Sequence, residues 1–205
     1  MTDNHKVGGL LMVNIGHCIM QWSFVEHYLC LLFIRLHDGD REVADLIWGR
    51  IRSFEAKLQL LHEVSQRAAL EPEMKRDWNL LREETLRLYR KRNQVAHSTP
   101  VQGSSEPMAL EPFLSIYTDN KTIDIDDMRL FARQFTELAE ALCYLMKPLF
   151  KAAEETGTPH PQSAAQVPGL VHRLRSEDDR RREAQRHRAI AWRQYLERNP
   201  DLKLD

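Results

Sequence analysis

A short polar stretch near the middle of the chain, residues 90–98, holds the residue types that acid–base chemistry on a phosphate ester needs. Arg92 is followed by Asn93, and His97 lies five positions after the arginine. A histidine exchanges protons near neutral pH, and a guanidinium holds phosphate charge at any pH. Together they are the parts that a ribonuclease working without a metal ion requires. Nothing else in the sequence points so clearly to one chemistry.

The third of four long helical patterns positions these residues. Apolar residues recur at alternating steps of four and three over residues 72–98, which predicts a helix that packs against a neighbour. Arg92 falls in this apolar seam, where a leucine is expected. His97 is rotated about 140° from Arg92 on an ideal helix. Asn93 lies one turn before His97 and could orient its ring, while Thr99-Pro100 ends the helix and leaves His97 open to a groove.

Three further helical patterns lie within the first 155 residues. Apolar periodicity predicts them over residues 7–36, over residues 41–68, and from Asp126 or Asp127 to about Leu149. We assign Trp22, Trp78 and Phe131 to the core that these helices enclose. Between the third and fourth helices, residues 113–117 and 122–125 predict a small β-hairpin. The predicted fold is all-α, an up-down bundle of four long helices with this hairpin inserted.

The chain divides at a stretch rich in Pro, Gly, Ser, Ala and Gln. Residues 1–155 form the predicted bundle, residues 156–172 a linker, and residues 173–205 a basic helix that we expect to be detached or weakly docked. The bundle and linker to His172 carry 19 Lys or Arg and 23 Asp or Glu, whereas the tail carries 10 and 7. A contact of the tail with RNA or a partner is one interpretation of its charge run, and a solvated helix is the other.

The composition of the chain limits the classes of function that it can have. The net charge of −1 gives no global field that draws the chain to nucleic acid. The three cysteines, Cys18, Cys30 and Cys143, have no C-x-x-C spacing and are interpreted as reduced, buried residues of a cytoplasmic protein. His5, His17, His27, His37 and His62 show no metal-ligand spacing with a nearby carboxylate, so we expect neither a metal ion nor another cofactor. The uncharged residues 7–25 carry a polar stripe, which favours a buried helix over a membrane span.

The motif and its place in the helix order resemble a known superfamily. Arg92-Asn93-x-x-x-His97 near the end of the third helix of an all-α bundle resembles the HEPN (higher eukaryotes and prokaryotes nucleotide-binding) superfamily. Glu26 and Lys57, each among apolar residues, also resemble positions that many members keep polar within the core. The resemblance covers about residues 7–153 and leaves the tail out.

This resemblance implies a metal-independent endoribonuclease. Members typically form a homodimer in which the third helices meet, so that two Arg/His pairs line one cleft. By this resemblance His97 is the general acid or base at the ribose 2′-hydroxyl or the leaving oxygen, Arg92 stabilises the phosphate charge, and Asn93 orients groups. Tyr89 would be a stacking platform for a base and Arg90 a contact to phosphate. The 2′-hydroxyl requirement makes the substrate RNA.

The biological role expected from the resemblance is bacterial toxin–antitoxin biology or phage defence, with an antitoxin or a small nucleotidyltransferase as a possible partner. Three alternatives stay open. Arg92 can be a buried structural cation paired with Glu26, with His97 a helix cap. The domain can be a non-catalytic HEPN module that binds a protein or a nucleotide. The chain can also be a helical scaffold protein whose basic tail recruits a partner.

Overall fold

The fold is all-α in class. The computed structural model describes residues 3–37, 39–101, 113–116, 121–151 and 163–198. Within these ranges the chain forms six helices, with three short strands between the fourth helix and the fifth. The helices are α1 (Asp3–Leu36), α2 (Arg41–Arg50), α3 (Phe54–Arg67), α4 (Pro72–His97), α5 (Ile125–Lys151) and α6 (Ser163–Arg198).

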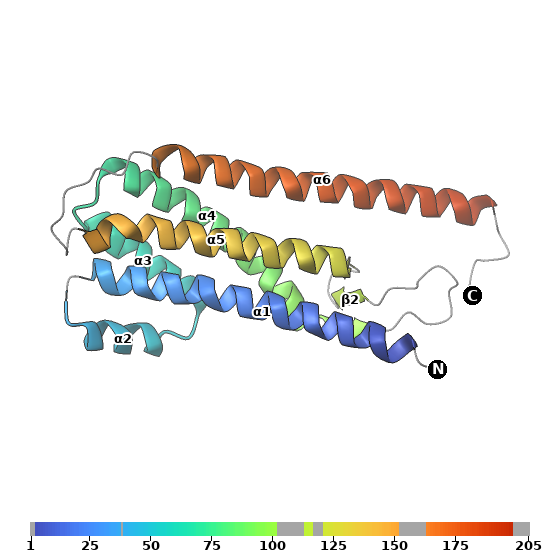
Figure 1. The fold of residues 1–205 in the computed structure, drawn as a ribbon, viewed down its shortest axis with the longest axis horizontal. Coiled ribbons are helices and arrows are strands. Elements are labelled where there is room, and N and C mark those ends of the chain that lie inside the picture. The colour runs from blue at the N-terminus through green and yellow to red at the C-terminus, as the bar shows by residue number, and fades with distance from the viewer. Residues whose placement is uncertain (1–2, 38, 102–112, 117–120, 152–162, 199–205) are drawn as a thin grey trace.

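Three long helices, α1, α4 and α5, form the body of the molecule. Figure 1 shows α1 and α5 running in the same direction and α4 running against them, with α2 and α3 at one end. The core lies between these helices because each turns its apolar seam inward. Trp22, Trp78 and Phe135 are almost completely buried there, and Phe131 is buried as well. The assignment of Trp22, Trp78 and Phe131 to the core is confirmed.

The second predicted helix is in fact two helices. The expectation of one helix over residues 41–68 was wrong, because the chain leaves helical geometry at residues 51–53, between α2 and α3. Ser53 starts α3 by accepting a hydrogen bond from the amide of Ala56 at 3.3 Å. The break lets two aromatic residues pack into the core: Trp48 lies on Phe33, and Phe54 lies on Trp22.

The strands lie between α4 and α5. β1 (Thr99–Val101), β2 (Phe113–Ile116) and β3 (Lys121–Ile123) form an antiparallel sheet in the order β1-β2-β3. Thr99 is paired with Ser115, and Leu114 is paired with Ile123. β1 follows α4 directly, so the sheet lies at the end of α4 that carries His97. Tyr117, expected in the first strand of the hairpin, lies outside the described residues.

The C-terminal helix is docked, which differs from the expected detached or weakly docked tail. α6 begins at Ser163, inside the stretch expected to be a linker, and lies along the bundle on the side of α5 that faces away from α1 (Figure 1). Val167, Val171 and Leu174 are buried against the bundle. Apolar contact therefore anchors the first turns of the helix, and the ion pairs and hydrogen bonds described below continue the contact as far as Gln185.

The three cysteines agree with the sequence-based interpretation only in part. All three cysteines are free, Cys18 is buried, and Cys30 and Cys143 are half-buried. Burial raises the pKa of the Cys18 thiol to about 12, and the thiol donates a hydrogen bond to the carbonyl of Met128 at 3.1 Å. Cys18 is therefore an unreactive core residue. In the described part of the chain, every helix falls short of the length or apolarity that crossing a membrane requires.

Candidate functional site

The candidate site lies at the C-terminal end of α4. Pro72 occupies the first turn of α4, where its missing N–H costs nothing, and the helix ends at His97. Ser98 has an extended backbone and donates its hydroxyl proton to the carbonyl of Gln94, which satisfies one of the last helical carbonyls. Val95 is buried one turn earlier and anchors this end to the core.

Arg92 is a half-buried arginine without a carboxylate partner among the described residues. It occupies the apolar seam as the sequence predicted, between the buried side chains of Leu88 and Val95. Its Nη1 donates a hydrogen bond to Oδ1 of Asn93 at 3.3 Å. Its Nε is buried and has no hydrogen-bond partner within the described ranges. A guanidinium held in this way has unused capacity to bind an anion.

The expected structural partner of Arg92 is engaged elsewhere. Oε1 of Glu26 accepts a hydrogen bond from the indole nitrogen of Trp22 at 2.7 Å. No ion pair joins Glu26 to Arg92 in the described structure. Lys57, the other polar residue expected in the core, is half-buried with its Nζ 5.4 Å from the ring centre of Trp48. Glu26 and Lys57 therefore each contact an aromatic side chain of the core.

His97 is the last residue of α4, and its side chain is exposed. Because the helix stays regular to this point, His97 is rotated about 140° from Arg92. Asn93 bonds to Arg92 and makes no hydrogen bond to His97, so the expected orientation of the imidazole by Asn93 is not seen. The structure thus brings Arg92 and Asn93 together and leaves His97 separate, at an open helix end.

Two other cations of this part of α4, Arg87 and Lys91, are neutralised. Arg87 donates to both oxygens of Glu84 at 2.9 Å and also contacts Asp178 of α6. Lys91 donates to Oε1 of Gln134 at 2.8 Å and contacts the same aspartate. Burial, reinforced by the charge of Arg87, lowers the pKa of Lys91 to about 7, while the charge of Glu84 acts in the opposite direction. Neither cation is free to steer phosphate.

Arg90 and Tyr89, the two residues expected to contact the RNA, differ in their surroundings. Arg90 is exposed and has no ion pair or hydrogen bond among the described residues. Tyr89 is half-buried, and its ring is stacked on Phe54 with 4.3 Å between the ring centres. The Tyr89 ring also lies 5.9 Å from that of Trp22. One face of Tyr89 therefore belongs to the aromatic core, which leaves it poorly placed to stack on a base.

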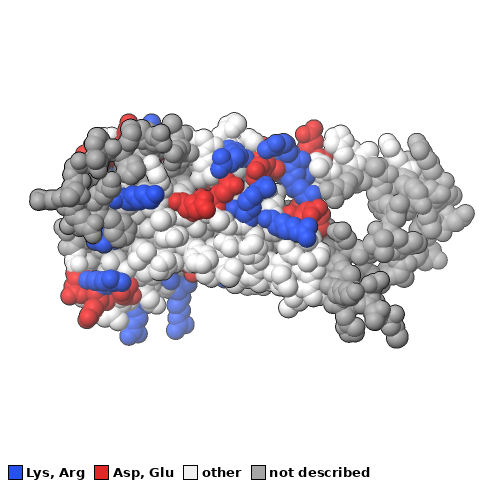
Figure 2. All heavy atoms as spheres, in the orientation of Figure 1, with Lys and Arg blue, Asp and Glu red and all other residues white. Residues whose placement is uncertain are grey.

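A buried polar cluster between α4, α5 and α6 was missed in the sequence. Glu84 and Gln134 are completely buried, and Asp178 is nearly so. The amide nitrogen of Gln134 donates to Oδ1 of Asp178 at 2.9 Å and to the carbonyl of Leu174 at 3.2 Å. Figure 2 shows the acidic and basic residues interleaved where α6 covers the bundle. The available signal was a polar residue, Gln134, within the helix that has the most regular apolar seam.

A second set of ion pairs ties α6 to the start of α5. Asp124 and Asp127 cap α5 reciprocally: the amide of Asp127 donates to Oδ1 of Asp124 at 2.8 Å, and the amide of Asp124 donates to Oδ2 of Asp127 at 3.2 Å. Arg181 binds both carboxylates, with its Nε 2.6 Å from Asp127. Gln185 donates to Asp127 as well. The basic run of the tail is therefore partly used to hold the helix in place.

The described residues contain no group of three or more histidine, cysteine or acidic side chains that could bind a metal ion. Comparisons with protein-family models, with curated proteins and with solved structures find no match to this chain.

Proposed function

We propose that this protein is a metal-independent endoribonuclease of the HEPN type, with Arg92 and His97 as its catalytic residues. The observation that carries the proposal is the state of Arg92, a half-buried guanidinium with no carboxylate partner among the described residues, while Arg87 and Lys91 on the same helix are neutralised. A phosphate group would supply the missing anion. The exposed His97 lies five residues away at the helix end.

In the proposed reaction the ribose 2′-hydroxyl attacks the adjacent phosphorus and the bond to the 5′-oxygen breaks. The products are a 2′,3′-cyclic phosphate and a free 5′-hydroxyl. His97 accepts the proton of the 2′-hydroxyl or donates one to the leaving oxygen, and acid–base help of this kind contributes about 10²–10⁴-fold. Arg92 stabilises the charge that develops on the phosphate, and a single such donor contributes about 10²–10³-fold. Asn93 fixes the guanidinium through its hydrogen bond.

The separation of Arg92 from His97 supports a role for a homodimer. With about 140° between them on one helix, one copy does not direct both side chains to the same point. A second copy whose α4 ends nearby could supply the complementary residue, as the HEPN resemblance implies. We further propose a cytoplasmic role as a toxin or in phage defence, with an antitoxin or a nucleotidyltransferase as partner, and this part rests on the resemblance alone.

The test is cleavage of a generic RNA in excess EDTA. The wild type should cleave, His97→Ala should lose the activity, and His172→Ala, which removes an exposed histidine of α6, should keep it. Equal cleavage by the wild type and by His97→Ala would contradict the assignment, because the activity would then come from another group or a contaminant.

A second candidate is a non-catalytic module that binds RNA or a nucleotide. The same separation of Arg92 and His97 favours it, because binding needs the cation alone. In that case the wild type would bind RNA without cleaving it, Arg92→Ala would weaken the binding, and His97→Ala would leave it unchanged.

A further inference from the structure

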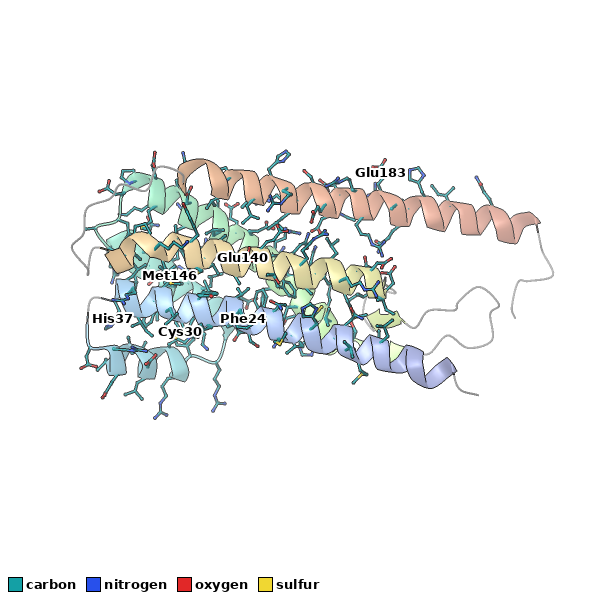
Figure 3. The ribbon with its side chains drawn as sticks, viewed as in Figure 1. Phe24, Cys30, His37, Glu140, Met146 and Glu183 are labelled. Carbon is teal, nitrogen blue, oxygen red and sulfur yellow. The ribbon has the colours of Figure 1, made fainter. Side chains whose placement is uncertain are left out.

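One face of α1 is apolar and exposed. Among the described residues, eight large apolar side chains are exposed, and five of them lie on α1. They are Leu10, Met12, Val13, Met20 and Phe24, with between 42% and 67% of their surface exposed. Val13, Met20 and Phe24 share one side of the helix, and monomeric proteins seldom expose apolar residues together in this way. Phe24 can be located on the middle part of α1 in Figure 3.

The exposed residues follow a helical spacing. Gly9, Val13, Gly16, Met20 and Phe24, which we call the outer stripe, are separated by steps of four, three, four and four, so they share one side of the helix. The opposite side of α1 is buried in the core at Leu11, Cys18, Trp22, Val25 and Leu29. Helix α1 is therefore apolar on two faces, and the bundle covers only one of them.

We propose that the outer stripe binds a second copy of this chain, with the two α1 helices antiparallel. Residues 7–25 contain no Asp, Glu, Lys or Arg, so the surface offers no charge to select a charged partner. An isologous interface instead requires a surface that complements itself. The outer stripe does so when the two-fold axis passes between Gly16 and His17.

The sizes of the paired residues support this register. Phe24 of one copy then lies opposite Gly9 of the other, and Met20 lies opposite Val13. A Cβ atom built at Gly9 or at Gly16 would meet nothing within 4 Å, so there is open space above both positions. A large ring can occupy the space above Gly9, and the glycines at either side of the axis let the two helices approach closely.

The body of α4 is unsuited to the same role. None of the exposed large apolar residues in the described structure lies on α4. One side of α4 carries the ion pairs to α6, and its seam packs into the core. The apolar contact that holds two copies is therefore supplied by α1.

The α1 pairing would also bring the two α4 ends to the same level. Trp22 of α1 contacts Tyr89 of α4, and the two helices run in opposite directions (Figure 1). His97 is eight residues beyond Tyr89, so it lies level with about residue 14 of α1 at equal helical rise. The axis near Gly16 is only a few residues away. The two ends do not meet there, because α4 packs on the core side of α1 through Trp22, opposite the outer stripe. The interface therefore does not rest on the proposed function.

Light scattering and sedimentation of the full chain over a concentration series from about 1 to 300 µM test the interface. The contact between two outer stripes extends over only about 24 Å of each helix. This is small for a stable dimer, so we expect a dimer that dissociates on dilution. Met20→Glu should raise the dissociation constant at least about a hundredfold, because each dimer would bury two carboxylates against Val13. Its melting temperature at low concentration should not change, since Met20 is half exposed.

Leu46→Glu is the matched control, because Leu46 is as exposed as the residues of the stripe but lies on α2. It should leave the dimer intact. A monomer at every concentration, or a dimer that Met20→Glu does not weaken, would overturn the proposal. Val13→Lys repeats the test at a second exposed position, in case Met20→Glu lowers the melting temperature.

Cysteine cross-linking tests the antiparallel register. The double variant Val13→Cys, Met20→Cys should form a disulfide-linked dimer on mild oxidation. Each single variant should not, because identical positions lie about 10 Å apart along the helices. Cross-linking of either single variant would overturn the antiparallel arrangement, because identical positions face each other only in a parallel pair, and so would a double variant that does not cross-link. RNA cleavage enters neither measurement, so failure of the interface and failure of the proposed ribonuclease are separate results.

Discussion

Replacement of Arg92 by leucine separates a functional arginine from a structural one. Leucine fits the apolar pattern of the α4 seam, and its side chain would fill the space between Leu88 and Val95 with apolar atoms. In the wild type, the Nε of Arg92 is buried without a partner among the described residues, and such a group costs about 1–3 kcal/mol. Because Arg92 is only half-buried, we expect Arg92→Leu to raise the free energy of unfolding by the lower part of that range, about 1–2 kcal/mol.

The assay is thermal unfolding followed by circular dichroism, together with RNA cleavage in EDTA. For a chain of this size, each kcal/mol moves the melting temperature by about 2–4 °C. Arg92→Leu should therefore melt a few degrees above the wild type and lose cleavage. A functional residue that lowers the stability of its own fold is the expected pattern when an active site occupies a core position.

The matched control is Arg87→Leu, one and a half turns earlier on the same helix. It would leave the carboxylate of Glu84, which is fully buried, without its closest cation. Removing one partner of a buried pair typically costs about 3–5 kcal/mol, so this variant should melt well below the wild type. A melting temperature for Arg92→Leu that falls as that of Arg87→Leu does would refute the reasoning, because it would show that Arg92 has a structural partner.

Two further predictions concern the packing of α6 and a buried acid. Asp178→Asn should lower the free energy of unfolding by about 3 kcal/mol, because Arg87 and Lys91 lose a buried carboxylate. It should also make α6 more sensitive to trypsin. Asp179→Asn, which removes the carboxylate of an exposed ion pair, should change the free energy of unfolding by less than about 1 kcal/mol. Equal effects of the two variants would contradict a special role for the buried pair. Burial raises the pKa of Asp77 above its ordinary value of 3.8, so the folded state binds the proton more tightly and this group's contribution to stability falls as the pH rises through that window. Asp77→Asn should thus be at least as stable as the wild type at pH 7 and lose this advantage near pH 4, as melting curves at both pH values would show; a variant that is less stable at pH 7 would mean that the ion pair with Arg76 outweighs burial.

The helices that bury one clear apolar seam were predictable from the sequence. α4 was expected over residues 72–98 and extends from Pro72 to His97, because a regular step of three and four residues fits one secondary structure only. The same regularity concealed the break between α2 and α3. Apolar residues continue at helical spacing across residues 51–53, and only the packing of Trp48 and Phe54 on separate parts of the core requires the chain to turn there.

The positions of the candidate site residues along their helix were also predictable from the sequence, but their contacts were not. The sequence placed Arg92 on the seam and His97 at the helix end, since both positions follow from counting along one helix. It left open whether Arg92 had a carboxylate partner, because that depends on which side chains of other helices reach it. The structure engages Glu26 with Trp22 instead. It also shows that Asn93 bonds to Arg92 and not to His97.

The sequence by itself determined the residue types and their order on each helix, since these depend on periodicity within one element. Only the tertiary structure decided which charges are neutralised. In the sequence, Lys91 and Asp178 are both members of mixed charge runs that can equally well remain solvated. Because α6 docks through Val167, Val171 and Leu174, these charges are forced out of water together and must pair. Arg92, on another side of the same helix, has no carboxylate in reach among the described residues.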